Sequence, residues 1–269
     1  MDEDFTIAVS PRHSVRLARE YDAVIRKAPG RDFVIRTLVR REANGMPLMS
    51  AEIVIAGAST RAEFPLAEAY PLHFRKTYFP ARLHGDPKQE FERQAEASGL
   101  IGVPPPIGYG PQVFRACLIP GQPFGALSPF DAEPMERNFP RARELALDAA
   151  AGLWLLAERA FEQLSVLHEA GLVHGDAVLR NFIVCPSPLE ILPIDFEVSQ
   201  RREALSDDEW ALRCQGDFDP LLTQATLLQC ALGPQQGRFA EQSLAHLDRL
   251  FKEPDRVRRL IERSSDVAG

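Results

Sequence analysis

The chain has 269 residues, a mass of 30.0 kDa and a formal net charge of −7 at pH 7. Hydrophobic residues make up 45% and charged residues 26%, which is typical of a globular protein and argues against a disordered or fibrous chain. The acidic balance, with a pI of about 5.5, argues against nucleic-acid binding through bulk charge.

Neither a secretory signal nor a transmembrane segment is expected. The N-terminal residues are acidic and lack a basic region followed by an apolar stretch. The most apolar segment, Leu145–Phe161, is interrupted by Asp148, Glu158 and Arg159. The cysteines form no CxxC pair, so neither a zinc site nor a disulfide framework is indicated, and a cytoplasmic location is expected. The oligomeric state stays open.

The first half of the chain predicts mostly strands. Residues 1–50 are interpreted as an N-terminal extension, in which apolar spacing predicts a helix over Ser14–Lys27. A helix is predicted over Pro87–Ser98. Strands are predicted over Glu52–Ala56, Glu63–Tyr70, Pro71–Phe79 and Gln112–Ile119. Residues 51–120 are therefore expected to form an antiparallel sheet with one helix.

The second half predicts mostly helices. A central buried helix is predicted over Arg141–Ala170, with Gly171 ending it. Two short strands, Asn181–Val184 and Glu190–Ile194, are expected to form a hairpin. Further helices are predicted over Pro220–Leu232 and Arg238–Phe251.

One segment carries most of the information about function. Residues 167–184 read LHEAGLVHGDAVLRNFIV, and residues 194–197 read IDFE. In this order, with Asn five residues after Asp176 and a hairpin between the motifs, the segment resembles the protein-kinase-like superfamily. The likeness is to the branch that has HGD and DFE, which includes aminoglycoside phosphotransferases, lipopolysaccharide sugar kinases and the small kinase of the tRNA threonylcarbamoyl complex. It covers about Ala51 to Phe196.

The resemblance implies an α+β, bilobal kinase-like fold. Its N-lobe, residues 51–120, would be an antiparallel sheet with one helix, and its C-lobe, residues 121–269, would be small and mostly helical. It also implies ATP and Mg²⁺ as cofactors. Because phosphoryl transfer depends on positioning and charge neutralisation, Asp176 is the candidate base, and Asn181 and Asp195 are candidate oxygen ligands for Mg²⁺. Arg180, directly before Asn181, would neutralise the γ-phosphate or bind a backbone carbonyl.

Lys76 lies in the predicted third strand, where the family has its phosphate-binding lysine. Lysines are scarce in this chain, and the flanks Phe74 and Tyr78 are apolar and aromatic, which favours a function over a solvated strand edge. A glutamate of the following helix would orient Lys76. The three candidates are Glu90, Glu92 and Glu96. Helical spacing does not distinguish among them, although distance along the chain favours Glu90.

Other nucleotide contacts follow from the same resemblance. No GxGxxG motif is present, and Gly57-Ala-Ser-Thr60 is either a short phosphate loop, with Gly57 and Ser59 as its contacts, or an ordinary hairpin turn. Leu118 and Ile119 resemble the hinge whose backbone would bind adenine. Asp217 or Asp219 would brace the catalytic loop.

The implied activity is an ATP- and Mg²⁺-dependent phosphotransferase acting on a hydroxyl of a sugar, a small molecule or a protein. A sugar or small molecule is favoured, because the HGD and DFE spellings resemble those of sugar and small-molecule kinases and the activation segment is truncated, with no APE-like motif after Glu197. Two alternatives remain: a pseudokinase that binds nucleotide as an interaction module, and an enzyme that transfers AMP. The sequence does not identify the acceptor.

Overall fold

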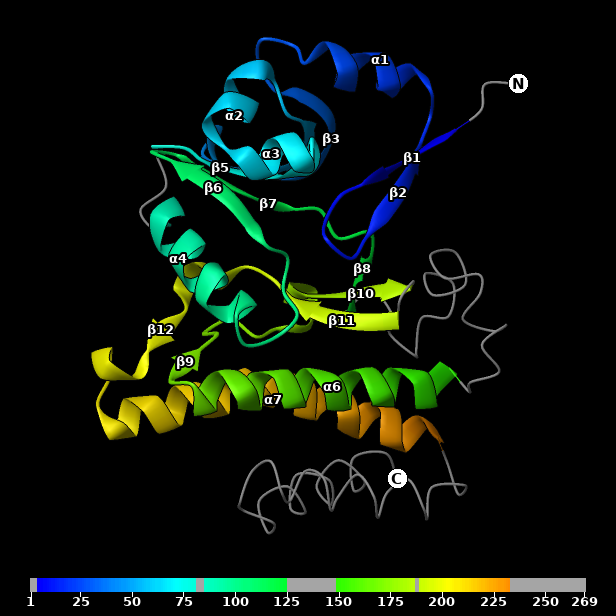
Figure 1. Cartoon of the computed structure of the whole chain (residues 1–269). Helices are drawn as coiled ribbons and strands as arrows, with labels where there is room; N and C mark the ends of the chain where they lie inside the picture. Colours follow the sequence, from blue (N-terminus) through cyan, green and yellow to red (C-terminus); the bar gives the residue numbers. More distant parts are fainter. Residues whose placement is uncertain (1–3, 81–84, 125–148, 187–188, 233–269) are drawn as a thin grey trace. The chain divides into compact units, whose positions relative to one another are not determined.

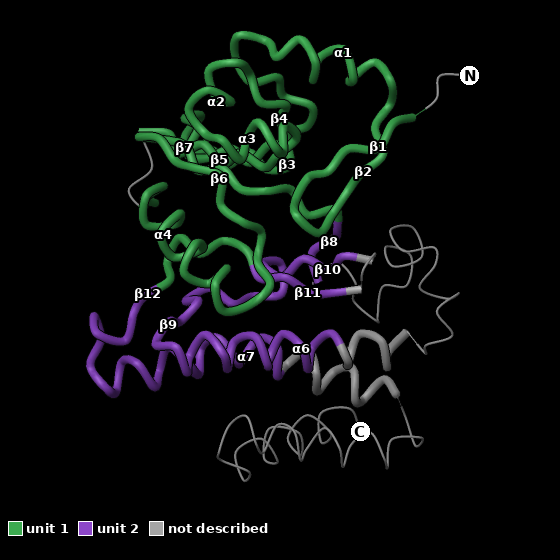
Figure 2. The backbone as a smooth tube through the Cα atoms, in the orientation of Figure 1, with its two compact units in different colours: residues 1–120, 194–199 green, residues 121–193, 200–269 purple. Residues whose placement is uncertain are grey.

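The computed structural model describes residues 4–80, 85–124, 149–186 and 189–232, and the chain is α+β with antiparallel sheets. It divides into two compact units (Figure 2): unit 1 contains Met1–Pro120 and Ile194–Ser199, and unit 2 contains Gly121–Pro193 and Gln200–Gly269. The predicted helix over Arg238–Phe251 lies outside the described residues. Among the described residues, no helix combines the length and apolarity needed to cross a membrane.

Unit 1 is built on a five-stranded antiparallel sheet (Figure 1). Its strand order is β3-β4-β5-β7-β6. The strands are β3 (Phe33–Ala43), β4 (Met46–Ile55), β5 (Leu72–Tyr78), β6 (Pro106–Gly110) and β7 (Val113–Cys117). The strands predicted in the regions of β4, β5 and β7 are confirmed, whereas β3 and β6 were missed.

The β3–β4 hairpin shows why residues 1–50 are not a separate extension. Asn44 and Gly45, at its turn, have φ values of 51° and 74°, a conformation that Asn and Gly tolerate and that tight hairpins favour. Further upstream, β1 (Phe5–Ala8) and β2 (Ser14–Leu17) form a second hairpin. Residues before position 51 therefore supply an edge of the sheet and part of the core of unit 1.

The predicted helix over Ser14–Lys27 is half wrong. Ser14–Leu17 is strand β2, in which Val15 and Leu17 are partly buried and Ser14 and Arg16 are exposed. Helix α1 begins only at Glu20 and ends at Lys27. Apolar residues of these elements pack on a cluster of Val9, Ile55 and Leu72.

Two short helices, α2 (Ala58–Glu63) and α3 (Pro65–Ala69), follow β4. The strand predicted over Glu63–Tyr70 is therefore wrong. Pro65 occupies the start of α3, where a missing N–H costs no helical hydrogen bond, and Ala67 packs on a core cluster with Ile107 and Cys117. The expectation of a single helix over residues 51–120 is also wrong, because this range contains α2, α3 and α4.

Helix α4 (Pro87–Ser98) has the predicted bounds. The Asp86 side chain accepts a hydrogen bond from the backbone N–H of Lys88 at 2.9 Å, and Pro87 occupies the first turn. Phe91 of α4 packs against a cluster that includes Tyr78 and Phe114, so α4 covers one face of the sheet. The opposite face, with Cys117, packs on α3.

Unit 2 contains two long helices, α6 (Ala149–Glu169) and α7 (Asp207–Leu232). Gly171 follows α6 with a φ of 80°, as predicted for a residue that ends a helix. Helix α7 begins 13 residues before the predicted start at Pro220, which lies inside it. The predicted residues 141–148 of the central helix lie outside the described residues.

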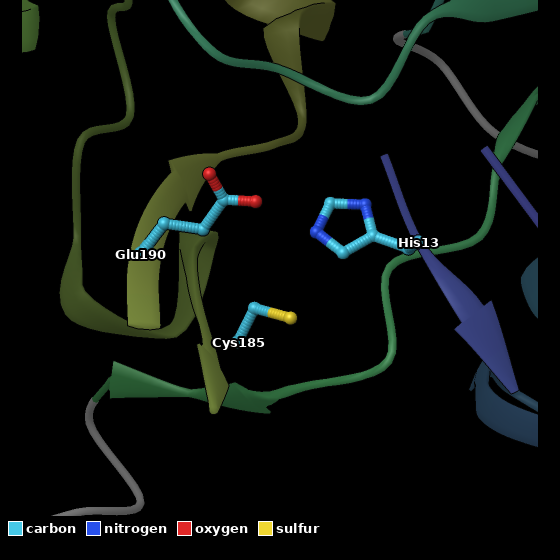
Figure 3. A group of neighbouring side chains, drawn as sticks. All are labelled: His13, Cys185 and Glu190. Atoms are coloured by element: carbon cyan, nitrogen blue, oxygen red, sulfur yellow. The ribbon is translucent and has the colours of Figure 1, made fainter. Parts of the chain in front are cut away.

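The predicted hairpin of unit 2 is confirmed as β10 (Phe182–Pro186) and β11 (Leu189–Pro193). Strand β8 (Gln122–Pro123) joins them, and β9 (Leu172–Val173) pairs with β12 (Gln200–Arg201). Cys185 and Glu190 are directly paired across the hairpin, and Figure 3 shows both side chains on the same face. His13, drawn in the same view, belongs to unit 1, where its Nδ1 lies 2.7 Å from the Ser10 hydroxyl.

Candidate functional site

Lys76 is buried on the face of the sheet that packs against α4. It is paired with Ala51 of β4 and with Phe114 of β7, so its stem lies among apolar neighbours. Only 4% of the residue is exposed. A buried ammonium needs paired charges and hydrogen bonds, because burial removes its hydration.

Three carboxylates supply those partners. Lys76 Nζ donates to Glu90 Oε1 at 3.1 Å, to Asp195 Oδ1 at 2.5 Å and to Glu197 Oε2 at 2.8 Å. All of these residues belong to unit 1. Together with Tyr78 they form what we call the Lys76 cluster.

The structure distinguishes between the three candidate glutamates of α4. Glu90 is 1% exposed and contacts Lys76, one turn into the helix. Glu92 is exposed and lies 3.7 Å from Lys88, and Glu96 lies 3.4 Å from Arg93. Glu90 is therefore the helix partner of the lysine.

Tyr78 connects two of the carboxylates. It follows Lys76 by two residues in β5, so both side chains leave the same face of the sheet. Its hydroxyl contacts Glu90 Oε2 in a short hydrogen bond and lies 3.2 Å from Glu197 Oε2. Its ring centroid is 5.1 Å from Lys76 Nζ, within range of a cation–π interaction.

The cluster perturbs the protonation of its members. Burial would lower the pKa of Lys76, but Glu90, Asp195 and Glu197 raise that pKa well above its usual value. Burial raises the pKa of Glu90 to about 7, although the Lys76 charge opposes the shift. Burial and the Glu90 charge also raise the pKa of Tyr78. Lys76 is thus charged at neutral pH, and the Tyr78 phenol is neutral.

Local backbone geometry brings two carboxylates from one short segment to Lys76. Asp195 has a φ of 69°, and the 3₁₀ turn Phe196–Val198 follows it. Phe196 is fully buried and anchors the segment. Carboxylate oxygens of Glu90, Asp195 and Glu197 lie within 4.8 Å of one another, and all three accept hydrogen bonds from the Lys76 ammonium.

In unit 2, Asp176, Arg180 and Asn181 are brought together by one loop. Asn181 Nδ2 donates to the backbone oxygen of Asp176 at 2.8 Å and to its carboxylate at 2.9 Å. Arg180 Nη2 lies 3.2 Å from the same carboxylate, and its side chain is 61% exposed. These donors orient the Asp176 carboxylate, and the Asn181 side chain is folded back onto the loop.

Asp217 of α7 braces this loop. Its carboxylate accepts the backbone N–H groups of His174 and Gly175, both at 2.8 Å, and lies 2.9 Å from His168 Nε2. Asp219 is exposed and contacts Gln215 at 3.5 Å. Of the two aspartates considered from the sequence, Asp217 therefore holds the loop.

The structure does not place Gly57 and Ser59 with Lys76. The Gly57 N–H donates to Asp32 Oδ1 at 3.0 Å, and Asp32 in turn binds Arg75, whose side chain leaves β5 on the face opposite Lys76. Ser59 is exposed and donates to the Gly30 carbonyl at 3.2 Å. The segment is the start of α2 rather than a hairpin turn, and these contacts do not support a phosphate loop beside Lys76.

Leu118 and Ile119 follow β7 directly, and the boundary between the units falls after Pro120. Leu118 packs against the cluster of Ile55 and Leu72. Their assignment to an adenine-binding hinge stays a prediction.

Two members of the Lys76 cluster carried no predicted role. Glu197 was part of the DFE motif, and Tyr78 was read only as an aromatic flank. Period-two alternation places Tyr78 on the same strand face as Lys76, so this signal could have identified Tyr78. The reach of Glu197 depends on the backbone turn after Asp195, which the sequence does not specify.

Comparisons with known protein families and with curated protein sequences gave no match.

Proposed function

We propose that the chain is an ATP- and Mg²⁺-dependent phosphotransferase that moves the γ-phosphoryl group to a hydroxyl of a sugar or another small molecule. The observation that carries the proposal is the buried Lys76 paired with Glu90 and Asp195. A lysine held beside a helix glutamate and a DFE aspartate is the arrangement that kinase-like enzymes use on nucleotide phosphates. Lys76 would neutralise those phosphates.

The donor chemistry fits the proposed cation. Asp195, whose side chain is 32% exposed, would offer a carboxylate oxygen, and Asn181 would offer an amide oxygen. Each by itself is a hard oxygen donor of the kind that Mg²⁺ prefers. Both Asn181 hydrogen bonds described above use its amide nitrogen, so the oxygen is the atom that would bind the cation. The cation would neutralise charge on the phosphates.

Asp176 would accept or orient the proton of the acceptor hydroxyl. Its carboxylate is half-buried, and Asn181 and Arg180 hold its orientation. The loop is braced through Asp217, so this orientation rests on a helix rather than on a loop alone.

Because Gly57 and Ser59 do not lie beside Lys76, the β3–β4 turn is the candidate loop that would bind the phosphates. It joins the two strands that precede the lysine strand, which is where kinase-like folds have their glycine-rich loop. Only one glycine, Gly45, lies in this turn.

That short turn favours a second candidate, a nucleotide-binding interaction module without transfer activity. A turn with a single glycine offers few free backbone N–H groups to a triphosphate. Asp176 separates the two candidates, because nucleotide binding alone does not require a base.

The test measures ATP binding and phosphoryl transfer to a panel of sugars and small alcohols, with the full chain and with Asp176→Asn. The variant should bind ATP normally and transfer phosphate about 100-fold or more slowly. Asp219→Asn, on the exposed surface of α7, is the matched control and should be unaffected. Product masses distinguish transfer of phosphate from transfer of AMP.

Normal transfer by Asp176→Asn would refute the assigned base. ATP binding without transfer, in the wild type and the variant alike, would establish the interaction module instead.

A further inference from the structure

Lys76 has no spare hydrogen in the described arrangement. An ammonium group has three donors, and three carboxylates accept them: Glu90, Asp195 and Glu197. A phosphate can therefore bind Lys76 only if one carboxylate gives up its hydrogen bond.

Under the proposed function, on which this inference rests, Asp195 is the carboxylate that has another task. Its side chain is 32% exposed, compared with 2% for Glu90 and 8% for Glu197. If Asp195 binds a cation, Glu90 and Glu197 still hold Lys76, and one hydrogen becomes free. Without Glu197, a lysine on a flexible four-carbon stem would be held by Glu90 alone.

Glu197 is itself held in place. Its Oε2 lies 3.2 Å from the Tyr78 hydroxyl, and its 3₁₀ turn is anchored by the buried Phe196. Gly85 packs beside the Tyr78 ring and the Glu197 carboxylate, and its φ is +117°. A Cβ at this position would lie 2.5 Å from the Tyr78 ring and 3.1 Å from Glu197 Oε1. This packing fixes the carboxylate before any ligand arrives.

We propose that Glu197 is a positioning residue for Lys76, holding the ammonium from the Asp195 segment as Glu90 holds it from α4. Glu197 acts through Lys76 and does not touch the nucleotide. The DFE motif would thus supply two residues with different roles: Asp195 as a cation ligand and Glu197 as a positioning residue for Lys76.

The test compares Glu197→Gln, which keeps the shape and removes the charge, with Glu92→Gln on the exposed face of α4. The first measurement needs no nucleotide: the rate of Lys76 acetylation by N-acetoxysuccinimide, followed by peptide mass spectrometry. The exposed Lys27, which contacts neither Glu92 nor Glu197, serves as the internal reference. Lys76 should react severalfold faster in Glu197→Gln and at the wild-type rate in Glu92→Gln.

The second measurement is steady-state kinetics. Glu197→Gln should raise KM for Mg·ATP about tenfold or more, as loss of a supporting contact commonly does. A purely structural role would instead reduce the folded fraction, which lowers the apparent kcat and leaves KM unchanged. If Glu197→Gln does not fold, Glu197→Asp keeps the charge, shortens the reach and should also speed Lys76 acetylation.

The outcomes separate this inference from the proposed function. An active wild type, with Glu197→Gln unchanged in both acetylation rate and KM, overturns the positioning role of Glu197. An inactive wild type with faster Lys76 acetylation in Glu197→Gln refutes the phosphotransferase while supporting the positioning role. Unchanged acetylation in a folded variant contradicts the inference whether or not the chain is an enzyme.

Discussion

Arg75 and Lys76 are neighbours in β5, and their side chains form ion pairs on opposite faces of the same sheet. Lys76 pairs with Glu90 on the α4 face. Arg75 lies 3.1 Å from Asp32 and 2.5 Å from Glu52 on the other face. The first arrangement is the candidate site, and the second links the sheet to the segment that precedes it.

This separation predicts different effects of conservative exchanges at the two positions. Lys76→Arg should weaken ATP binding about tenfold or more, because a planar guanidinium does not replace a compact ammonium among three carboxylates. Arg75→Lys should leave ATP binding unchanged and lower the free energy of unfolding by about 1 kcal/mol, since it loses the fork to Asp32 and Glu52. ATP titration and urea unfolding measure the two effects. Equal ATP binding by wild type and Lys76→Arg would contradict the role of Lys76.

Asp195→Asn should remove the Mg²⁺-dependent part of ATP binding. The amide is a weaker cation ligand than the carboxylate, while Lys76 keeps Glu90 and Glu197 and the fold is retained. ATP affinity should fall about 100-fold in Mg²⁺ and change little in EDTA. Circular dichroism checks the fold, and an unchanged response to Mg²⁺ would show that the cation is held elsewhere.

Asp217→Asn should loosen the loop that carries Asp176. An amide nitrogen in place of one carboxylate oxygen would face a backbone N–H and leave it unpaired. The expected loss is about 2 kcal/mol in the free energy of unfolding, together with faster amide exchange at His174 and Gly175. Asp219→Asn, two residues away and exposed, should change stability by less than about 0.5 kcal/mol. Similar losses in both variants would argue against the bracing role.

The extent to which the sequence predicts this site depends on the range of each interaction. Motif spacing predicted Asp176, Asn181 and Asp195 as site residues, because they lie at fixed positions in the HGD and DFE motifs. Glu90 was favoured, and its contact with Lys76 rests on how α4 packs on the sheet, which helical periodicity alone does not set. The contact of Glu197 with Lys76 depends on the left-handed backbone conformation at Asp195, which has no signature in the sequence.

The fold errors have equally local causes. The Asn44-Gly45 pair is a strong hairpin signal, and it forms the turn that joins β3 to β4 within the region expected to be an extension. The segment over Glu63–Tyr70 is too short for periodicity to distinguish a strand from a helix. In the structure its second half is helix α3, whose Ala67 packs against Ile107.

Stability should fall as the pH is lowered from 6.5 to 4, through His73. Burial, together with the Arg115 charge, lowers the pKa of His73 from 6.5 to about 4, so the unfolded chain takes up the proton first. The contribution of neutral His73 to stability is therefore present above pH 6.5 and is lost as the pH falls toward 4. When the pH is lowered from 7.5 to 4.5, the free energy of unfolding should fall by about 2 kcal/mol less in His73→Gln than in the wild type. Urea unfolding at the two pH values measures this difference. Parallel pH profiles would show that His73 does not titrate this way.

Ser199 and Ser206 are the nearest hydroxyls after the DFE motif, and neither is free to act as a phosphorylation switch. Ser199 is fully buried. Ser206 caps α7: its hydroxyl lies 2.7 Å from Glu209 Oε2 and accepts the Glu209 N–H at 3.3 Å. The protein should therefore need no phosphorylation here for its activity.

Ser206→Ala should lower the free energy of unfolding by about 1 kcal/mol, the usual cost of a lost N-cap, and leave ATP turnover unchanged. Ser98→Ala, an exposed serine whose hydroxyl contacts the Ala95 carbonyl at 2.8 Å, is the control and should change both quantities little. Ser206→Asp should retain the cap, because aspartate also accepts an N-terminal N–H, and should not stimulate turnover. Turnover is measured with unphosphorylated protein of confirmed mass. Higher turnover in Ser206→Asp than in wild type would show that a negative charge at α7 activates the enzyme, and it would move the acceptor assignment from small molecules toward protein.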